Sequence, residues 1–267
     1  MKFTKMQGLG NDYVYLDCTK ETPKNLPELA VRMSRRGFGV GADGLICICP
    51  SSQADVKMRM FNADGSEGEM CGNGIRCVGK FVYDKGLVPK RELTVETLAG
   101  IRRLWLQTEG GQVAAATVDM GEPAVAPEQI LEVGEAAYRV TPVSVGNPHA
   151  VVFWDGIERM ALKTLGPQFE RHPAFPNRTN AEFVEVASPN HLRVRVWERG
   201  SGETLACGTG ACAALAAAVS AGRARREAVV SLPGGDLRIF WPKDKEIYMT
   251  GPAVTVYEGE YDNGSDQ

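Results

Sequence analysis

The sequence predicts an α+β fold of two pseudo-symmetric domains, each a curved, mixed or antiparallel, barrel-like sheet wrapped around a central helix. Two observations support this prediction. Short apolar runs recur along the 267 residues without alternating regularly with helical patterns, which disfavours a doubly wound sheet. The stretch Met70–Gly74 (MCGNG) also has a counterpart in the second half of the chain, Ala206–Gly210 (ACGTG), and each precedes a helical run. We interpret this recurrence as an internal duplication.

The sequence offset that separates Cys71 from Cys207 relates further identical residues, and these belong to unusual residue types. The pairs are Gly10 with Gly146, Asn11 with Asn147, Glu67 with Glu203, and Gly86 with Gly222. We therefore expect one domain over residues 1–115 plus a C-terminal strand within 253–267, and a second over 116–252. Cys71 would belong to the first domain and Cys207 to the second.

The first half opens with a strand, a Gly-rich turn at Gly8–Asp12 and a second strand. A helix is expected over Leu26–Arg35, because Pro27 suits its first turn. Gly37–Gly44 holds four glycines in eight residues, but a strand at Leu45–Cys49 follows, so a dinucleotide-binding loop is disfavoured. The elements expected next are a strand at 56–61, a helix at 74–85, and strands at 93–95, 101–106 and 113–120.

The second half repeats this plan. Strands are expected at 138–145, 150–154, 181–186 and 192–197, with further strands and turns over 229–257. A short helix is expected at 160–169, interrupted by Gly166–Pro167. Ala211–Ala221 holds seven alanines in eleven residues, and a helix so small on every side is typical of one buried within a curled sheet.

Composition argues against several classes of protein. The net charge of −3 and the pI near 5.8 give no electrostatic case for binding nucleic acid or an anionic membrane. No apolar run approaches the length of a membrane span, and the N-terminus lacks the apolar core of a signal peptide. We therefore expect a cytoplasmic protein. Its seven cysteines are not spaced like a disulfide framework, so free thiols are expected.

The two repeated motifs place a cysteine at the N-terminus of a helix. The positive potential there lowers a thiol pKa from about 8.5 toward neutrality. The neighbouring glycines let backbone N–H groups approach an anion, which makes a cradle for a carboxylate. One such motif is weak evidence, but two at matched places in a duplicated chain are much stronger.

If the duplicated halves face each other, the two thiols flank a cleft. One thiolate could then remove a proton from one face of a carbon while the opposite thiol delivers a proton to the other, which inverts a stereocentre. The sequence offers no recognisable pyridoxal phosphate lysine. Its histidines, His149, His172 and His191, are dispersed, so neither a cofactor nor a metal site is expected.

Several motifs together resemble the diaminopimelate epimerase family. They are Asn62–Ser66, Met70–Cys77, Gly146–His149, Trp197–Gly200 and Ala206–Ala213, and the resemblance runs from Lys5 to Val254. Proline and hydroxyproline racemases also use two cysteines but have different surrounding motifs. Relatives of the phenazine-biosynthesis type share the fold and lack the cysteine pair.

The resemblance implies a cofactor-independent interconversion of LL- and meso-2,6-diaminoheptanedioate, in lysine and peptidoglycan precursor synthesis. It implies that Cys71 and Cys207 are the acid/base residues, the first donating and the second accepting the proton in the LL-to-meso direction. It implies that His149 and Glu198 are candidates for tuning cysteine pKa values, and that a homodimer forms through the strand ending at Tyr257. The implied substrate-binding residues are Asn11, Asn62, Gly72, Asn73, Asn147, Asn180, Glu198, Arg199, Gly208 and Thr209.

Two alternatives remain open from the sequence. The chain could be a racemase for another amino acid, although Glu198 and Arg199 argue against proline because they suit a second charged end of the substrate. It could instead be a non-catalytic thiol protein in which Cys71 and Cys207 form a redox-switched disulfide. One position departs from part of the family, since some members have a side-chain amide where this chain has Gly44. The remaining cysteines of the strands and helices, Cys47, Cys49, Cys77 and Cys212, are interpreted as core residues.

Overall fold

The computed structural model describes residues 1–243 and 245–262. The chain divides into two compact units. Unit 1 comprises residues 1–118 and the C-terminal residues from 251 onward, and unit 2 comprises residues 119–250. Cys71 lies in unit 1 and Cys207 in unit 2.

The duplication is visible in the helices themselves. α2 (Gly72–Asp84) and α4 (Gly208–Ser220) both have 13 residues, and each begins directly after its motif cysteine. α1 (Leu26–Ser34) and α3 (Leu162–Glu170) both have 9 residues, and their first residues are related by the same offset. The offset inferred from the motifs therefore holds unchanged from the first helix of each unit to the second, without a net insertion.

The sheets of the two units follow one strand order. In unit 1, β2 runs parallel to β3, and β4 runs parallel to β6, while the other pairs are antiparallel. The strands are β1 (Lys2–Gly8), β2 (Asn11–Asp17), β3 (Gly44–Cys49), β4 (Val56–Asn62), β5 (Glu67–Gly68), β6 (Glu92–Thr97), β7 (Gly100–Glu109), β8 (Gln112–Asp119) and β19 (Val254–Glu260).

In unit 2, β12 is parallel to β13, and β14 is parallel to β16, at the corresponding places. The strands are β9 (Ala124–Val125), β10 (Gln129–Val133), β11 (Ala136–Ser144), β12 (Pro148–Phe153), β13 (Asn180–Ser188), β14 (His191–Glu198), β15 (Gly202–Thr204), β16 (Glu227–Leu232), β17 (Gly235–Phe240) and β18 (Tyr248–Pro252). A one-turn 3-10 helix, η1 (Ile157–Arg159), precedes α3. The predicted α+β class with a mixed sheet is confirmed.

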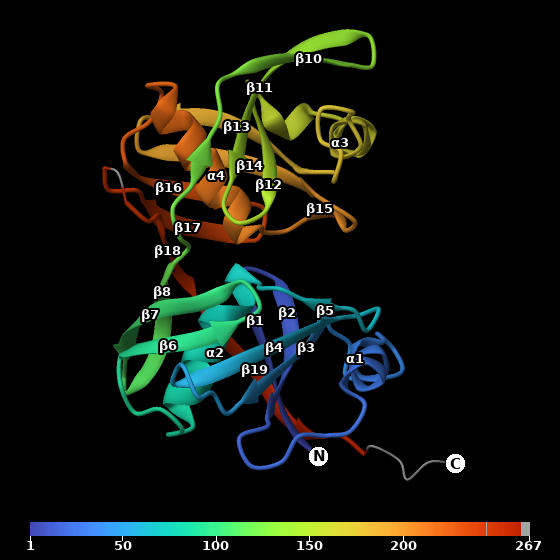
Figure 1. The fold of residues 1–267 in the computed structure, drawn as a ribbon, viewed down its shortest axis with the longest axis vertical. Helices are drawn as coiled ribbons and strands as arrows, with labels where there is room; N and C mark the ends of the chain where they lie inside the picture. Colours follow the sequence, from blue (N-terminus) through green and yellow to red (C-terminus); the bar gives the residue numbers. More distant parts are fainter. Residues whose placement is uncertain (244, 263–267) are drawn as a thin grey trace. The chain divides into compact units, whose positions relative to one another are not determined.

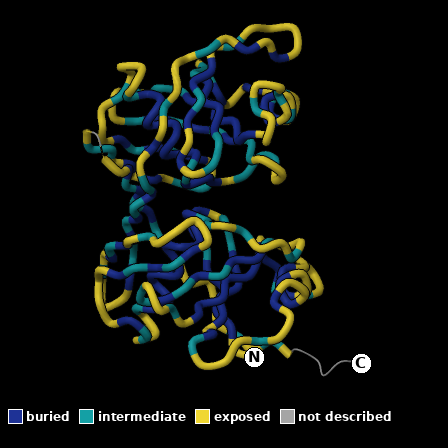
Figure 2. The backbone as a smooth tube through the Cα atoms, viewed as in Figure 1, coloured by how far each residue is buried: buried dark blue, intermediate teal, exposed yellow. Residues whose placement is uncertain are grey.

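Each sheet curves around its long helix, α2 in unit 1 and α4 in unit 2 (Figures 1 and 2). Most residues of both helices are buried, and the alanine-rich residues 211–218 of α4 are all inaccessible to solvent. Small side chains on every face let a sheet approach a helix from all sides. The burial expected from the alanine content is confirmed.

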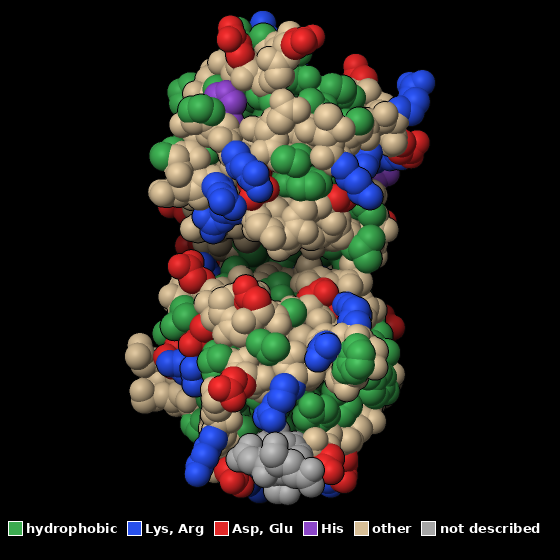
Figure 3. Space-filling model, turned by 90° about the vertical axis from the view of Figure 1, so that its right-hand side faces the viewer, with side chains coloured by type: hydrophobic (Ala, Val, Ile, Leu, Met, Phe, Trp, Pro, Cys, Tyr) green, Lys and Arg blue, Asp and Glu red, His purple; other side chains and the backbone are tan. Residues whose placement is uncertain are grey.

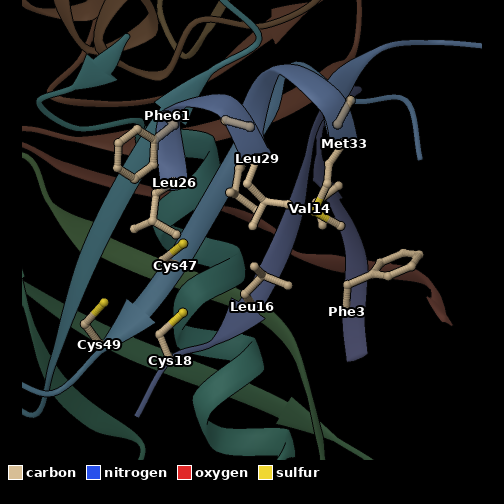
Figure 4. Packing of buried hydrophobic residues seen from close by; sticks show 13 residues of the cluster. Phe3, Val14, Leu16, Cys18, Leu26, Leu29, Met33, Cys47, Cys49 and Phe61 are labelled. Atoms are coloured by element: carbon tan, nitrogen blue, oxygen red, sulfur yellow. The ribbon is translucent and has the colours of Figure 1, made fainter. Parts of the chain in front are cut away.

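A second helix packs on the outer surface of each sheet. In unit 1, Leu26, Leu29 and Met33 of α1 point toward strands β2, β3 and β4 and form a dry cluster with Val14 and Phe61 (Figure 4). Cys47 and Cys49 belong to this cluster and are buried, as expected for small core residues, and Cys18 is buried beside them. The strands are therefore held between two helical layers, which fixes the positions of their ends.

Three expectations about elements need correction. α2 and α4 begin at Gly72 and Gly208, earlier than expected, so the motif glycines form the first helical turn. α3 continues through Gly166 and Pro167. Gly166 is there for packing, because a Cβ at this position would lie 2.4 Å from Cγ of Trp197. The short strands β5, β9, β10 and β15 are additional to the elements that the sequence predicts.

On the face drawn in Figure 3, acidic and basic side chains are interspersed over both units. Several residues of β19 expose apolar side chains, namely Val254, Val256 and Tyr257. Within the described ranges, no helix is both long and apolar enough to cross a membrane.

Candidate active site

Two half-sites lie at the N-termini of the central helices. Cys71 is the N-cap of α2, with φ −127° and ψ 117°, and its Sγ accepts a hydrogen bond from the Gly74 N–H at 3.3 Å. Cys207 is the N-cap of α4, with φ −118° and ψ 114°, and its Sγ accepts one from the Gly210 N–H at 3.4 Å. Duplication has thus preserved the backbone geometry that holds each sulfur at a positive helix end.

Strand β2 supplies the neighbours of Cys71. Asn11, Tyr13 and Tyr15 alternate along the strand and so share one face. The Cys71 thiol donates to Asn11 Oδ1 at 3.2 Å, and the Tyr13 hydroxyl is hydrogen-bonded to the same thiol. The Tyr15 hydroxyl donates to the Gly74 carbonyl at 3.0 Å. One strand face thereby lines the first turn of α2.

The Asn11 amide is itself fixed by a charged cluster. Its Nδ2 donates to Asp43 Oδ2 at 2.8 Å, which leaves Oδ1 facing the thiol. Arg36 bridges Asp43 at 3.0 Å and Asp12 at 2.7 Å, and Lys5 pairs with Asp12 at 2.7 Å. The orientation of Asn11, predicted from sequence as a site residue, therefore follows from the glycine-rich loop that carries Asp43.

Gly44 makes room for the tyrosine in this half-site. Gly44 pairs with Tyr13 in the parallel β2–β3 ladder, and a Cβ at Gly44 would lie 2.8 Å from the Tyr13 ring and 2.2 Å from the Phe61 carbonyl oxygen. A side chain at position 44 and the tyrosine ring cannot both fit. This steric exclusion accounts for glycine at position 44.

Cys207 has different neighbours. Its Sγ lies 3.5 Å from the Thr209 hydroxyl, and Asn147 Nδ2 donates to that hydroxyl at 3.3 Å. Asn147 Oδ1 in turn lies 2.9 Å from His149 Nε2, and His149 Nδ1 lies 2.7 Å from Glu182 Oε1. A continuous polar chain thus connects a buried carboxyl group to the sulfur.

Glu198 completes this half-site from the end of β14. It is hydrogen-bonded to Cys207 and accepts a hydrogen bond from the Thr204 hydroxyl at 2.5 Å. Burial raises the pKa of Glu198, and the Glu182 charge raises it further, against the lowering effect of its hydrogen bonds. A carboxyl group that touches the sulfur and holds its proton more tightly than usual is suited to exchange that proton with the thiol.

The electrostatics of Cys207 correct the expectation of a lowered thiol pKa. Burial raises the pKa of Cys207 well above its ordinary value, and the charges of Glu198 and Glu182 add to this effect. Hydrogen bonds from Thr209 and the Gly210 N–H act in the opposite direction but are weaker. Desolvation and two carboxylates therefore outweigh the helix N-terminus, and the isolated half-site favours the thiol.

The remaining predicted residues divide between the half-sites. Gly72 and Asn73 form the first turn of α2, and Gly208 and Thr209 form that of α4. First-turn N–H groups have no carbonyl partner within their own helix, so they suit an incoming carboxylate. Asn62 ends β4, where its Nδ2 donates to Ser66 Oγ at 3.0 Å.

Asn180 and Arg199 lie together at the edge of the Cys207 half-site. The Asn180 side chain donates a hydrogen bond to the Pro148 carbonyl and accepts one from the Arg199 N–H at 2.8 Å. It therefore fixes the position of the Arg199 backbone. The Arg199 guanidinium donates to the Asn177 carbonyl at 3.2 Å. Tyr257 stands apart from both half-sites, on β19, with its ring against Phe3.

Sequence reasoning missed three side chains that surround the sulfurs, namely Tyr13, Asp43 and Glu182. A usable signal was present. The offset between the two motif cysteines also relates Tyr13 to His149 and Ile46 to Glu182, so extending it beyond identical residues would have aligned these pairs. The search for identities passes over such pairs because the two halves differ there.

Comparison with known proteins identifies one family. The family model described as Diaminopimelate epimerase matches residues 3–126 and 141–256. Among curated proteins, the diaminopimelate epimerase of Acetivibrio thermocellus is 53% identical over 276 residues, covering 98% of this chain and 99% of that protein. The diaminopimelate epimerase of Methanococcus maripaludis strain S2 is also 53% identical, covering 98% of this chain and all of that protein.

Solved structures with lower identity share the fold. A phenazine biosynthesis protein of the PhzF family from Bacillus anthracis superposes with a TM-score of 0.78 at 18% identity, covering 98% of each chain. A probable proline racemase from Agrobacterium radiobacter, with bound carbonate, gives a TM-score of 0.76 at 16% identity over 98% of this chain and 93% of that one.

Proposed function

The chain belongs to the diaminopimelate epimerase family, and from this premise we propose that it interconverts LL- and meso-2,6-diaminoheptanedioate by a two-cysteine proton transfer. The observation that carries the proposal is the pair of N-cap cysteines, each with its sulfur at the first turn of a buried helix. The reaction requires no redox change, because one C–H bond breaks and another forms on the opposite face of the same carbon.

In the LL-to-meso direction, the Cys207 thiolate removes the α-proton and the Cys71 thiol delivers its own. Cys71 is suited to be the donor, because its thiol is directed at Asn11 Oδ1 and its sulfur is contacted by the Gly74 N–H, which stabilises the thiolate left behind. Glu198 touches Cys207 and is placed to accept its thiol proton. After one turnover the protonation states are reversed, so resetting them by proton exchange belongs to the cycle.

The weak acidity of an amino-acid α-proton is the chemical difficulty. We propose that negative charge developing on the substrate carboxylate is stabilised by N–H groups at the helix N-termini. These belong to Gly72, Asn73, Gly208 and Thr209. Glu198 suits a substrate ammonium and Arg199 the distal carboxylate. Side-chain amides supply further hydrogen-bond donors and acceptors for the substrate's ammonium and carboxylate groups. They belong to Asn11, Asn62, Asn147 and Asn180. No cofactor takes part in this scheme.

The physiological setting is part of the same proposal. We assign the enzyme to lysine and peptidoglycan precursor synthesis in the cytoplasm, acting as a homodimer. The seven free cysteines suit a reducing compartment. Cys71 and Cys207 must both be reduced for the reaction, so a protein with a disulfide between them would be inactive.

Chiral chromatography tests the substrate assignment. Reduced protein should convert LL-diaminopimelate to a mixture containing the meso isomer with no added cofactor, and should leave L-proline and L-lysine unchanged. L-lysine is a matched control because it lacks only the distal carboxylate, which Arg199 would bind. Racemisation of proline or lysine, with diaminopimelate untouched, would keep the chemistry and reject the substrate.

A further inference from the structure

Glu182 has a costly environment. Its side chain is fully buried, Oε1 lies 2.7 Å from His149 Nδ1, and Oε2 has no hydrogen-bond partner in the described part of the chain. A buried carboxyl group with one unsatisfied oxygen lowers the free energy of unfolding. Stability alone therefore does not explain this residue.

The duplication shows that the fold does not need a carboxyl group here. The counterpart of Glu182 in unit 1 is Ile46, which is equally buried on β3. Both residues pack against the third residue of their helix. A Cβ on Gly74 would lie 2.7 Å from Ile46 Cδ1, and a Cβ on Gly210 would lie 2.8 Å from Glu182 Oε1. An aliphatic side chain fills the same space in the half that lacks a histidine.

The hydrogen bonds of the chain determine where its protons lie. Asn147 Nδ2 donates to Thr209, so Oδ1 faces His149 and its Nε2 must carry the proton between them. The short distance between His149 Nδ1 and Glu182 Oε1 is that of a hydrogen bond, so one further proton lies between these two atoms, bonded to the nitrogen or to the oxygen. Without Glu182, His149 could rotate or move its proton to Nδ1, and Asn147 would lose its fixed orientation.

We propose that Glu182 is a positioning residue of the Cys207 half-site, which locks His149 with its Nε2–H on Asn147 and so orients the amide and hydroxyl that lead to the Cys207 sulfur. This inference rests on the proposed function for its catalytic meaning, but the geometry concerns only residues of unit 2. The groups that face the sulfur are Glu198 from β14 and Thr209 and the Gly210 N–H from α4, with His149 and Glu182 behind them. The Glu182 charge also acts on Cys207 directly, because it raises the pKa of that thiol.

Two substitutions in the reduced protein separate these effects. Glu182→Ile copies the residue of unit 1 and removes both the charge and the hydrogen bond. Glu182→Gln removes the charge but keeps a donor for His149 Nδ1. The readouts are the side-chain ¹⁵N resonances of His149, kcat and KM, and the pH dependence of iodoacetamide alkylation of each cysteine, resolved by peptide mass spectrometry.

We expect Glu182→Ile to shift the His149 ¹⁵N resonances and to lower kcat at least tenfold, with KM changed less than twofold. Glu182→Gln should keep the Nε2-protonated tautomer and recover kcat to within about threefold of the original. Both variants should alkylate Cys207 at lower pH, while Cys71 keeps its profile and serves as the internal control. If Glu182→Ile does not fold, the His149 tautomer and kcat of Glu182→Gln still decide the matter.

Unchanged His149 resonances and unchanged kcat in Glu182→Ile would overturn the proposal, as would a Glu182→Gln variant that loses the Nε2-protonated tautomer and still keeps the original kcat. The resonances and alkylation rates need no turnover. A protein that fails to epimerise diaminopimelate would therefore reject the proposed function while leaving the role of Glu182 measurable.

Discussion

Two cysteines with nearly the same backbone geometry have different surroundings. Cys71 has Asn11 and Tyr13 as neighbours, whereas Cys207 has Thr209 and Glu198, with Glu182 acting from farther away. Carboxyl groups act on the Cys207 thiol, whereas an amide oxygen and a tyrosine hydroxyl contact the Cys71 thiol, so the two sulfurs have different electrostatic surroundings.

The raised pKa of Cys207 has a consequence for stability. A thiol whose pKa is higher in the folded state than the unfolded value near 9.0 stabilises the fold fully below that pH. As pH rises above about 9, only the unfolded state loses this proton, so the free energy of unfolding falls by up to about 1.4 kcal/mol per pH unit.

Cys207→Ser, which does not titrate, is therefore expected to lose less stability than the original protein between about pH 9 and 11. Urea unfolding of both proteins in reductant, repeated across this range, measures the difference. A difference between the two proteins that stays constant with pH would show that Cys207 titrates alike in both states.

The sequence predicted those candidate site residues that belong to a recognisable motif. Two cysteines beside paired glycines, and Asn11 with Asn147 at the same offset, pointed to the site directly. The pKa of Cys207 was not predictable, because it depends on burial and on carboxyl groups that β13 and β14 bring to the sulfur. Glu182 carries no motif, and only the folded strand shows which way it points.

At the scale of elements, helix starts and the strands around them position the side chains of both half-sites. Asn11 at the start of β2 contacts Cys71 before α2, and strands β12, β13 and β14 all contact α4. Gly10 and Gly146 both have positive φ, at 83° and 87°, so the turn before the paired asparagines is also repeated. Glycine at both positions is what allows each Asn to enter the half-site from a tight turn.

Gly44→Ala tests the close approach of β3 and β4. Its Cβ would lie 2.2 Å from the Phe61 carbonyl oxygen, which is backbone and cannot move aside without distorting the ladder that ends at Asn62. We expect a loss of about 1–3 kcal/mol in the free energy of unfolding, with reduced epimerase activity.

Gly79→Ala is the matched control in the same unit. Its Cβ would meet only the methyl ends of Leu104 and Leu106, and alanine favours a helix interior over glycine by about 1 kcal/mol. Urea unfolding should show this variant close to the original protein. Equal losses in the two variants would mean that position 44 is not specially constrained.

Long elements were easier to predict than short ones. The apolar patterns of α1, β4 and β14 and the alanine run of α4 were sufficient for those elements. β5 and β15 are two and three residues long, too short for a periodic pattern. Ladder bonds and the ion pairs Arg59–Glu67 and Arg195–Glu203 join them to β4 and β14. The break expected at Pro167 was wrong, because α3 continues through this residue to Glu170.

At the scale of the whole molecule, the proposed homodimer would place a second copy of the chain against β19. Val254, Val256 and Tyr257 are 40%, 53% and 45% exposed, an unusual run of apolar side chains on one strand. Sedimentation velocity at micromolar concentration is expected to show a dimer. Tyr257→Arg should convert it to a monomer, because burying an unpaired guanidinium opposes association.

Ile130→Arg is the control for this prediction. Ile130 is also an exposed apolar residue, at 67%, but it lies on β10 in the other unit. That variant should sediment like the original protein. A monomer in the original protein, or a dimer that survives Tyr257→Arg, would contradict the proposed role of β19.

The most direct test of the two-cysteine account is α-proton exchange with solvent. Reduced protein is incubated with LL-diaminopimelate in deuterated water without cofactor. The products are separated by chiral chromatography, and their deuterium content is measured by mass spectrometry. The account predicts meso product carrying one deuterium at the inverted α-carbon, and loss of that product in Cys71→Ser and in Cys207→Ser. Deuterated meso product formed by a variant in which both cysteines are serine would contradict it.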